Sequence, residues 1–267
     1  MNALSSKDQM NSETVTYVKR DDHIALVTLN RPSAKNAINS ELAASLHAIV
    51  EESESDPDVW VVIISGGSGD VFCAGADLKE VAAGKGSSLF TSHGFAGLVF
   101  SERKKPWIAA VNGKALAGGF EIVLSCDLIV AASNASFGLP EVSRGLLAAA
   151  GGLYRLPRAL PRNIAIELAI TAGTIDSKRA EALGLVNKVV ENDQVLPEAI
   201  RLAERITANA PIAVRESLKV ARSIHDLDEE GLRSLTLECR ARAFASEDFK
   251  EGPRAFVEKR APRWTGK

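Results

Sequence analysis

The stretch from Pro106 to Glu141 constrains this chain most, because a buried strand, a glycine pair and a helix start follow one another within it. Its apolar run, Trp107 to Val111, predicts a fully buried strand. Ala117-Gly118-Gly119 come after a turn and directly before a helical pattern that begins near Phe120. We therefore expect an α/β unit in which a strand leads, through glycines, into a helix.

The start of that helix is a predicted site for a negatively charged oxygen. The first N–H groups of a helix have no intrahelical partner, and the helix dipole adds partial positive charge there. The backbone N–H of Gly118 is one candidate donor, and that of Ala76, in the turn after Gly75, is a second. Two such donors aimed at one carbonyl oxygen form an oxyanion hole. The alternative for Gly118-Gly119 is close packing of the helix on the strand.

Two glutamates accompany this predicted oxyanion site. Glu121 has apolar neighbours on both sides in the helical pattern, and Glu141 follows a proline in a turn. Taken singly, Glu121 is also compatible with a helix surface and Glu141 with a cap of the next helix. Paired carboxylates beside an oxyanion site predict acid–base catalysis on the molecule that carries the oxygen.

Charge and hydropathy exclude several classes of partner. A net charge of −2 gives no electrostatic reason to expect nucleic acid. No run approaches the ~20 apolar residues of a membrane span, and the first residues lack a signal peptide's basic and apolar regions. We expect a cytoplasmic protein without membrane or nucleic-acid partners.

The cysteines and histidines predict neither a disulfide framework nor a metal site. Three cysteines, without a C-x-x-C pair, are typical of buried reduced thiols. The four histidines are scattered, with no H-E-x-x-H, and no G-x-S-x-G marks a serine nucleophile. These residues are Cys73, Cys126, Cys239, His23, His47, His93 and His225.

Hydrophobic periodicity predicts an α/β fold followed by helices. Strand patterns at 15–20, 24–29 and 59–65 alternate with a helix that Asn39 caps, and a helix is also expected over 95–104. Residues 82–94, rich in Gly, Ser and Ala, predict a mobile loop next to the site. Helical patterns dominate from residue 194 onward. We expect a disordered leader (1–13), an α/β catalytic core (14–192) and a helical C-terminal subdomain (193–267).

Several motifs together resemble the crotonase (enoyl-CoA hydratase/isomerase) superfamily. The resemblance runs from about Val15 to the C-terminus, so it does not depend on one short motif. The matching segments are Asn30-Arg31-Pro32 with Asn36-Ala37, Phe72 to Lys79, Ile108 to Gly113, Ala117 to Glu121, Cys126-Asp127-Leu128, Phe137 to Glu141, and the late Glu251-Gly252-Pro253 with Glu258-Lys259-Arg260.

This resemblance implies a fold, a reaction and a set of site residues. The fold would be a spiral of β-β-α repeats with a helical C-terminal trimerisation subdomain, giving a homotrimer or a dimer of trimers. The reaction would be syn addition of water to a trans-2-enoyl-CoA, with no cofactor other than the coenzyme A of the substrate. Glu121 and Glu141 would be catalytic, and the N–H groups of Ala76 and Gly118 would bind the thioester oxygen. The coenzyme A would contact Lys35, Ala37, Ala74, Ala76, Asp77, Leu78, Lys79 and Gly118.

One segment departs from the family pattern. Typical hydratases carry Pro-Gly-Ala-Gly-Gly after the second glutamate, where this chain has Ala148-Ala149-Ala150-Gly151-Gly152. We expect the backbone N–H of Ala149 to hold the water there, and the altered shape to affect acyl preference. Carnitinyl-CoA dehydratases are similar in several segments. The alternatives are therefore a carnitinyl-CoA dehydratase, a Δ3-Δ2 enoyl-CoA isomerase, and a silent acyl-CoA- or RNA-binding relative.

Overall fold

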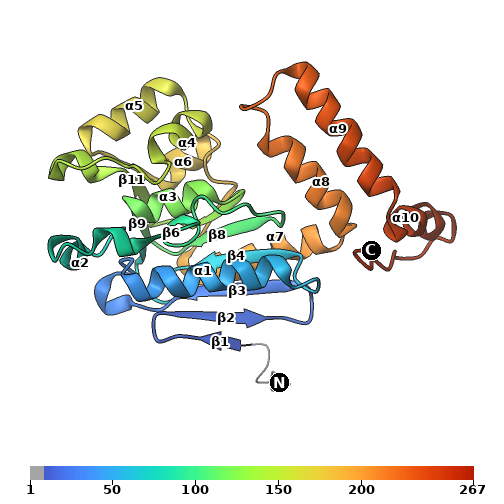
Figure 1. Ribbon diagram of the computed structural model, residues 1–267, viewed down its shortest axis with the longest axis horizontal. Coiled ribbons are helices and arrows are strands. Elements are labelled where there is room, and N and C mark those ends of the chain that lie inside the picture. Colours follow the sequence, from blue (N-terminus) through green and yellow to red (C-terminus); the bar gives the residue numbers. More distant parts are fainter. Residues whose placement is uncertain (1–8) are drawn as a thin grey trace.

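The computed structural model describes residues 9–267 and contains two sheets that a repeating β-β-α unit builds together (Figure 1). In each repeat one strand joins a seven-stranded sheet, the next strand joins a four-stranded sheet, and a helix or helical turn follows. The repeats begin at β4, β8 and β10, which lie parallel in the large sheet. The expected α/β spiral of β-β-α repeats is confirmed.

The strands fall into two sheets and one hairpin. The large sheet has the order β1 (Gln9–Asn11), β2 (Val15–Lys19), β3 (Ile24–Leu29), β4 (Val61–Ser65), β8 (Trp107–Val111), β10 (Leu128–Ala132), β13 (Lys188–Val190). The small sheet has the order β12 (Thr174–Asp176), β11 (Ser136–Gly138), β9 (Lys114–Leu116), β5 (Val71–Cys73), and the hairpin pairs β6 (Phe90–Thr91) with β7 (Gly94–Phe95).

Helices cover the sheets and form the C-terminal part of the chain. They are α1 (Ser40–Ser55), α2 (Leu78–Ala82), α3 (Gly118–Ser125), α4 (Gly152–Ala159), α5 (Arg162–Thr171), α6 (Ser177–Ala182), α7 (Val195–Thr207), α8 (Pro211–Arg222), α9 (Glu229–Phe244) and α10 (Glu247–Val257). The 3₁₀ turns are η1 (Pro32–Ala34), η2 (Gly86–Leu89), η3 (Pro140–Arg144) and η4 (Asn192–Gln194). None of the helices within residues 9–267 has the length and apolar character of a membrane span.

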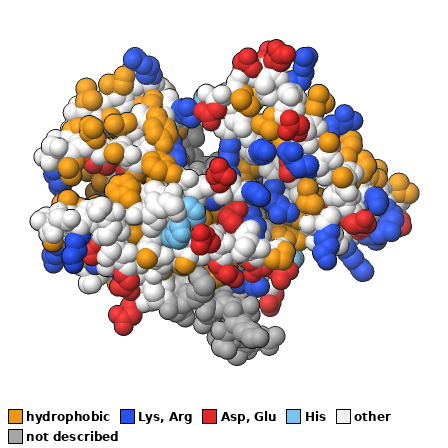
Figure 2. Space-filling view, in the orientation of Figure 1, with side chains coloured by type: hydrophobic (Ala, Val, Ile, Leu, Met, Phe, Trp, Pro, Cys, Tyr) orange, Lys and Arg blue, Asp and Glu red, His pale blue; other side chains and the backbone are white. Residues whose placement is uncertain are grey.

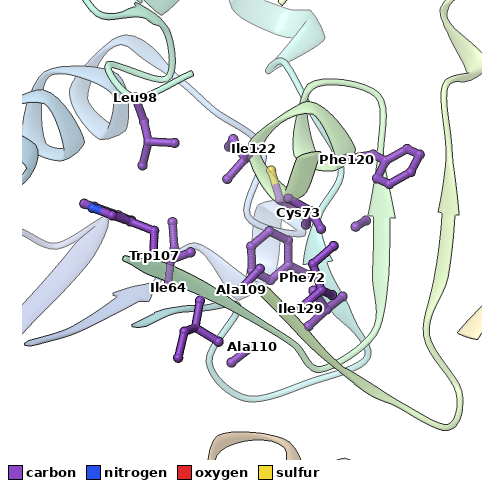
Figure 3. Close-up of a cluster of buried hydrophobic side chains, with 14 of the residues drawn as sticks. Ile64, Phe72, Cys73, Leu98, Trp107, Ala109, Ala110, Phe120, Ile122 and Ile129 are labelled. Atoms are coloured by element: carbon purple, nitrogen blue, oxygen red, sulfur yellow. The ribbon is translucent and has the colours of Figure 1, made fainter. Parts of the chain in front are cut away.

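The core positions the start of α3. Phe72 of β5 lies among side chains of the large sheet, including Ala109 and Ile129 (Figure 3). Phe120 and Ile122 of α3 pack into the same cluster and are fully buried. Close packing of this kind tolerates little displacement, so α3 is held firmly against β5.

The C-terminal helices divide into two groups. The helix α7 packs against β4, β8 and β10, whereas α8 and α9 pack against each other and project from the core beside α10 (Figure 1). The expected C-terminal helices are thus present. A domain boundary between residues 192 and 193 stays a prediction.

Three segments differ from the sequence-based expectation. The predicted helix over 95–104 is wrong: β7 ends at Phe95, and Ala96 and Gly97 have φ of 57° and 66°, a left-handed geometry that an α-helix excludes. The loop at 82–94 contains η2 and most of the β6–β7 hairpin. Of the expected leader, residues 1–8 lie outside the described residues, and Gln9–Asn11 pair with β2.

Candidate active site

The first residue of α3, Gly118, follows a backbone bend at Ala117. Ala117 has φ 52° and ψ −132°, a strained conformation for a residue with a side chain. Its N–H donates to Gly138 of β11, and its carbonyl accepts from Phe120 and Glu121. The small sheet and the first turn of α3 together hold this bend, which sets the direction of the Gly118 N–H.

The turn at Gly75 and Ala76 lies directly against Gly118. A Cβ added to Gly75 would lie 3.0 Å from the Gly118 nitrogen, and Gly75 itself has φ +93°. The Ile38 N–H donates to the Gly75 carbonyl, and the Asp77 N–H donates to the Ile38 carbonyl. In a parallel bridge of this kind the N–H of the central residue, Ala76, points away from Ile38. The structure therefore brings the two predicted oxyanion donors into neighbouring segments.

The glycine pair also serves close packing, the alternative that the sequence left open. A Cβ on Gly119 would lie 2.2 Å from the Cys73 carbonyl oxygen, so only glycine lets α3 approach β5 this closely. A Cβ on Gly118 would lie 2.4 Å from the ring of Phe95. Close packing is therefore a feature of this pair, and both glycines are buried at the start of α3.

Glu121 lies one turn into α3 and is 3% exposed. Its Oε1 accepts a hydrogen bond of 2.8 Å from the N–H of Gly152, the first residue of α4. The pKa of Glu121 is raised to about 7, mainly by burial; the hydrogen bond from the Gly152 N–H opposes this rise, and the negative charge of Glu141 contributes to it. The side chain is therefore able to exchange a proton near neutral pH.

Glu141 lies in η3 and is 9% exposed. Its buried Oε2 finds no hydrogen-bond partner among the described residues. Burial raises the pKa of Glu141 above its ordinary value, and Arg144 partly opposes this effect. Two buried carboxyls thus interact electrostatically, and one of them has an oxygen available for a ligand.

Known proteins share the sequence pattern and the fold of this chain. The family model described as "Enoyl-CoA hydratase/isomerase" matches residues 19–267. A crystal structure of enoyl-CoA hydratase from Mycobacterium tuberculosis H37Rv superimposes with a TM-score of 0.91 at 42% identity, covering 96% of this chain and all of the other. The chain belongs to the enoyl-CoA hydratase/isomerase family. The expected crotonase superfamily and its hydro-lyase class of enzyme are both confirmed.

Relatives with different names are similarly close. A mevalonyl-coenzyme A hydratase of Aspergillus fumigatus is 43% identical over 91% of each chain. A carnitinyl-CoA dehydratase of Salmonella typhi is 39% identical over 94% of this chain and 98% of its own. Because these values are so similar, overall identity does not assign one substrate within the family.

The segment after Glu141 corrects one sequence-based expectation. Ala149 was expected to offer its N–H to water, but this N–H donates to the Leu147 carbonyl at 2.8 Å. Gly152 instead supplies the N–H that contacts Glu121, and a Cβ on Gly152 would lie 3.1 Å from Glu121 Oε1. Although the segment departs from the family pattern, it keeps a glycine at residue 152, and this glycine contacts Glu121.

The residues expected to contact coenzyme A come together in two adjacent segments. The Ala74 N–H donates to the Lys35 carbonyl at 3.1 Å, and the bridge between Ile38 and Ala76 follows. Lys35, Leu78 and Lys79 are exposed, whereas Ala37, Ala74, Ala76 and Asp77 are half-buried. Two lysine ammonium groups therefore border the turn that carries the Ala76 N–H. Their contact with coenzyme A stays a prediction.

Sequence reasoning missed the residues that hold these two segments together. Arg31 forms an ion pair of 3.1 Å with Asp77 and also donates to the Ala37 carbonyl. The buried Asn36 side chain donates to the carbonyls of Gly66 and Phe72 at 2.8 and 2.9 Å. Arg31 lies in the matching segment Asn30-Arg31-Pro32 and Asn36 in the matching segment Asn36-Ala37, and these matches were the available signal. No sequence signal pointed to Phe95, whose ring packs against Gly118.

The raised pKa of Glu121 predicts a pH-dependent effect on stability. Its folded-state pKa of about 7 exceeds that of an unfolded glutamate, ~4.3, so the folded state loses stability as pH rises through this window. A Glu121→Gln variant lacks this penalty and still accepts the Gly152 N–H. At pH 8 we expect it to be more stable than the wild type by on the order of 3 kcal/mol. The difference should vanish below about pH 4.

Urea unfolding of both proteins from pH 4 to pH 8 measures this difference. An unchanged difference across the series would show that Glu121 titrates normally in the folded protein.

Proposed function

We propose that this protein catalyses the reversible syn addition of water to a trans-2-enoyl-CoA, giving a 3-hydroxyacyl-CoA. The observation that carries the proposal is the pairing of Glu121 with Glu141: both are buried, both have a raised pKa, and the charge of one raises the pKa of the other. Water addition needs a group that accepts a proton and a group that delivers one. Two carboxyls whose pKa lies above the ordinary range meet that need.

The oxyanion site activates the thioester. The N–H groups of Ala76 and Gly118 donate to the thioester carbonyl oxygen and draw electron density from Cβ. Negative charge grows on this oxygen when water attacks Cβ, so the two donors bind the transition state more strongly than the substrate. The start of α3 adds its dipole to the same effect.

The two glutamates manage the protons. The carboxylate of one takes a proton from the water whose oxygen bonds to Cβ, while the protonated carboxyl of the other delivers its proton to Cα. The carbon–carbon double bond becomes a single bond, and proton exchange with solvent restores the starting states. Close carboxyls that share one proton behave as a pair, so the raised pKa belongs to the dyad.

The remaining predicted contacts bind the coenzyme A portion of the substrate. The exposed ammonium groups of Lys35 and Lys79 are suited to its phosphates, and Ala37, Ala74, Asp77 and Leu78 border the same turn. The side chain of Asp77 caps α2 and pairs with Arg31, so it shapes this turn. The reaction as written needs no further cofactor.

The acyl preference of this proposed hydratase depends on the segment after Glu141. Leu146 and Leu147 there are 45% and 69% exposed, which supports contact with an apolar acyl chain. A turnover panel of straight-chain enoyl-CoAs of increasing length, with crotonobetainyl-CoA and mevalonyl-CoA added, tests the proposal. We expect kcat/KM for a straight-chain enoyl-CoA to exceed that for both specialised substrates. The absence of turnover across the panel would overturn the hydratase assignment.

The assembly and location of the protein also belong to the proposal. Large apolar side chains are exposed on α9 and α10, among them Leu237 (57%), Phe256 (85%) and Val257 (79%), which supports a homotrimer or a dimer of trimers. Light scattering after gel filtration distinguishes these masses from a monomer. Three free cysteines are compatible with the proposed cytoplasmic location.

A further inference from the structure

Three potential metal ligands meet where α1 faces the β6–β7 hairpin. His47 and Glu51 are one turn apart on α1, and His93 lies in the turn between β6 and β7. One ligand atom of each lies within 4.8 Å of the other two. The rings of His47 and His93 have their centroids 4.2 Å apart. Figure 2 shows histidine side chains grouped at the surface in this region. His47 and His93, which are scattered in the sequence, are therefore neighbours in the fold.

Hydrogen bonds orient the two imidazoles. Thr91 Oγ1 lies 3.0 Å from His47 Nδ1 and accepts the backbone N–H of His93 at 3.0 Å. If His47 Nδ1 donates to Thr91, its Nε2 carries a lone pair that faces the Glu51 carboxylate at 3.4 Å. A lone pair and a carboxylate repel each other unless a proton or a metal ion lies between them.

The environment of His93 favours the metal ion. Its Nδ1 is buried and has no hydrogen-bond partner within the part of the chain that the structure describes. A proton shared by His47 and Glu51 leaves this nitrogen unsatisfied, which is costly for a buried polar atom. A metal ion that His93 binds through this Nδ1, together with His47 Nε2 and the Glu51 carboxylate, would satisfy all three side chains.

We propose that His47, Glu51 and His93 form a binding site for a divalent transition-metal ion, best matched by Zn²⁺. Two imidazoles and one carboxylate are ligands that Zn²⁺ accepts, with water at the fourth tetrahedral position. Mg²⁺ prefers oxygen ligands and does not fit this set. Tetrahedral Zn²⁺ requires ligand atoms about 3.3 Å apart. The Glu51 side chain is 62% exposed and free to close the remaining gap.

The bound ion joins α1 to the β6–β7 hairpin. Phe95, two residues beyond His93, lies against the Cα of Gly118 at the start of α3. The metal ion therefore fixes the hairpin that covers one side of the oxyanion segment, while it contacts no part of the proposed catalytic pair. This assignment stands independently of the proposed hydratase reaction.

The site is tested by competition with a chromogenic zinc chelator. The protein is first treated with EDTA, and the assay is run at about pH 7.5, where free imidazole is neutral. We expect one Zn²⁺ per chain and no response to Mg²⁺. His47→Ala and His93→Ala should each weaken zinc binding at least about tenfold, and Glu51→Gln should weaken it too. Amide hydrogen exchange over residues 90–95 should slow when Zn²⁺ is added to the wild type, but not to His93→Ala.

His225→Ala and Glu52→Gln are the matched controls, because both residues are exposed and lie outside the cluster. They should bind Zn²⁺ as the wild type does. If a histidine variant fails to fold, zinc binding by Glu51→Gln still tests the site, because Glu51 is largely exposed and its replacement should not disturb folding. The proposal would be overturned if the wild type bound Zn²⁺ no more tightly than the His47→Ala/His93→Ala double variant. It would also be overturned if both control variants lost as much zinc affinity as the cluster variants.

Discussion

The Glu121→Gln and Glu141→Gln variants should each have a kcat for crotonyl-CoA hydration that is lower by about 10²–10⁴-fold. Glutamine keeps the shape of either side chain but neither accepts nor delivers a proton at neutral pH. Because Glu121 is held by the Gly152 N–H, the amide should occupy the same place. We expect KM to change much less than kcat.

The double variant and an exposed glutamate complete this test. Groups that act as one unit are not additive, so Glu121→Gln/Glu141→Gln should be little worse than the poorer single variant. Glu167→Gln, on the exposed face of α5, is the matched control and should keep wild-type turnover. Near-wild-type kcat in either single variant would contradict the two-carboxyl mechanism.

An Ala76→Pro variant should lower kcat by about 10²–10³-fold, because proline removes one of the two proposed oxyanion donors. The bridge to Ile38 uses the carbonyl of Gly75 and the N–H of Asp77, so proline at residue 76 breaks neither bond. Proline disfavours an α conformation in the preceding residue, and Gly75 is already outside that region. The loss should appear in single-turnover hydration of crotonyl-CoA at saturating substrate.

Glu229→Pro provides the control for this substitution. Residue 229 is the first of α9, a position where proline is well tolerated, and it lies far from the site in sequence. Its turnover should match the wild type. Unchanged turnover in a folded Ala76→Pro protein would show that this N–H does not bind the thioester oxygen.

Long apolar runs in the sequence predicted the strands of the large sheet, but not the whole fold. The runs at 59–65 and 107–111 became β4 and β8. The small sheet was largely missed because β5, β9 and β12 have three residues each, too few for a periodic pattern. The expected helix at 95–104 failed because Ala96, a good helix former, adopts a left-handed conformation in a turn that tertiary packing imposes.

The candidate site was predictable where its residues are near one another in sequence. Gly118 and Glu121 share the first turn of α3, so helix-start chemistry identified both. The contacts of Gly152 with Glu121 and of Phe95 with Gly118 come from segments that only the folded chain brings together. His47 and His93 illustrate the same limit, because neither has a motif of its own.

Incorporation of ¹⁸O from labelled water tests the central claim most directly. The protein is incubated with crotonyl-CoA in H₂¹⁸O, and the product is analysed by mass spectrometry. The account predicts 3-hydroxybutyryl-CoA that carries one ¹⁸O at C3, with the label greatly reduced in Glu121→Gln and Glu141→Gln. A product that arises only by movement of the double bond, with no ¹⁸O, would contradict the hydratase mechanism and indicate an isomerase.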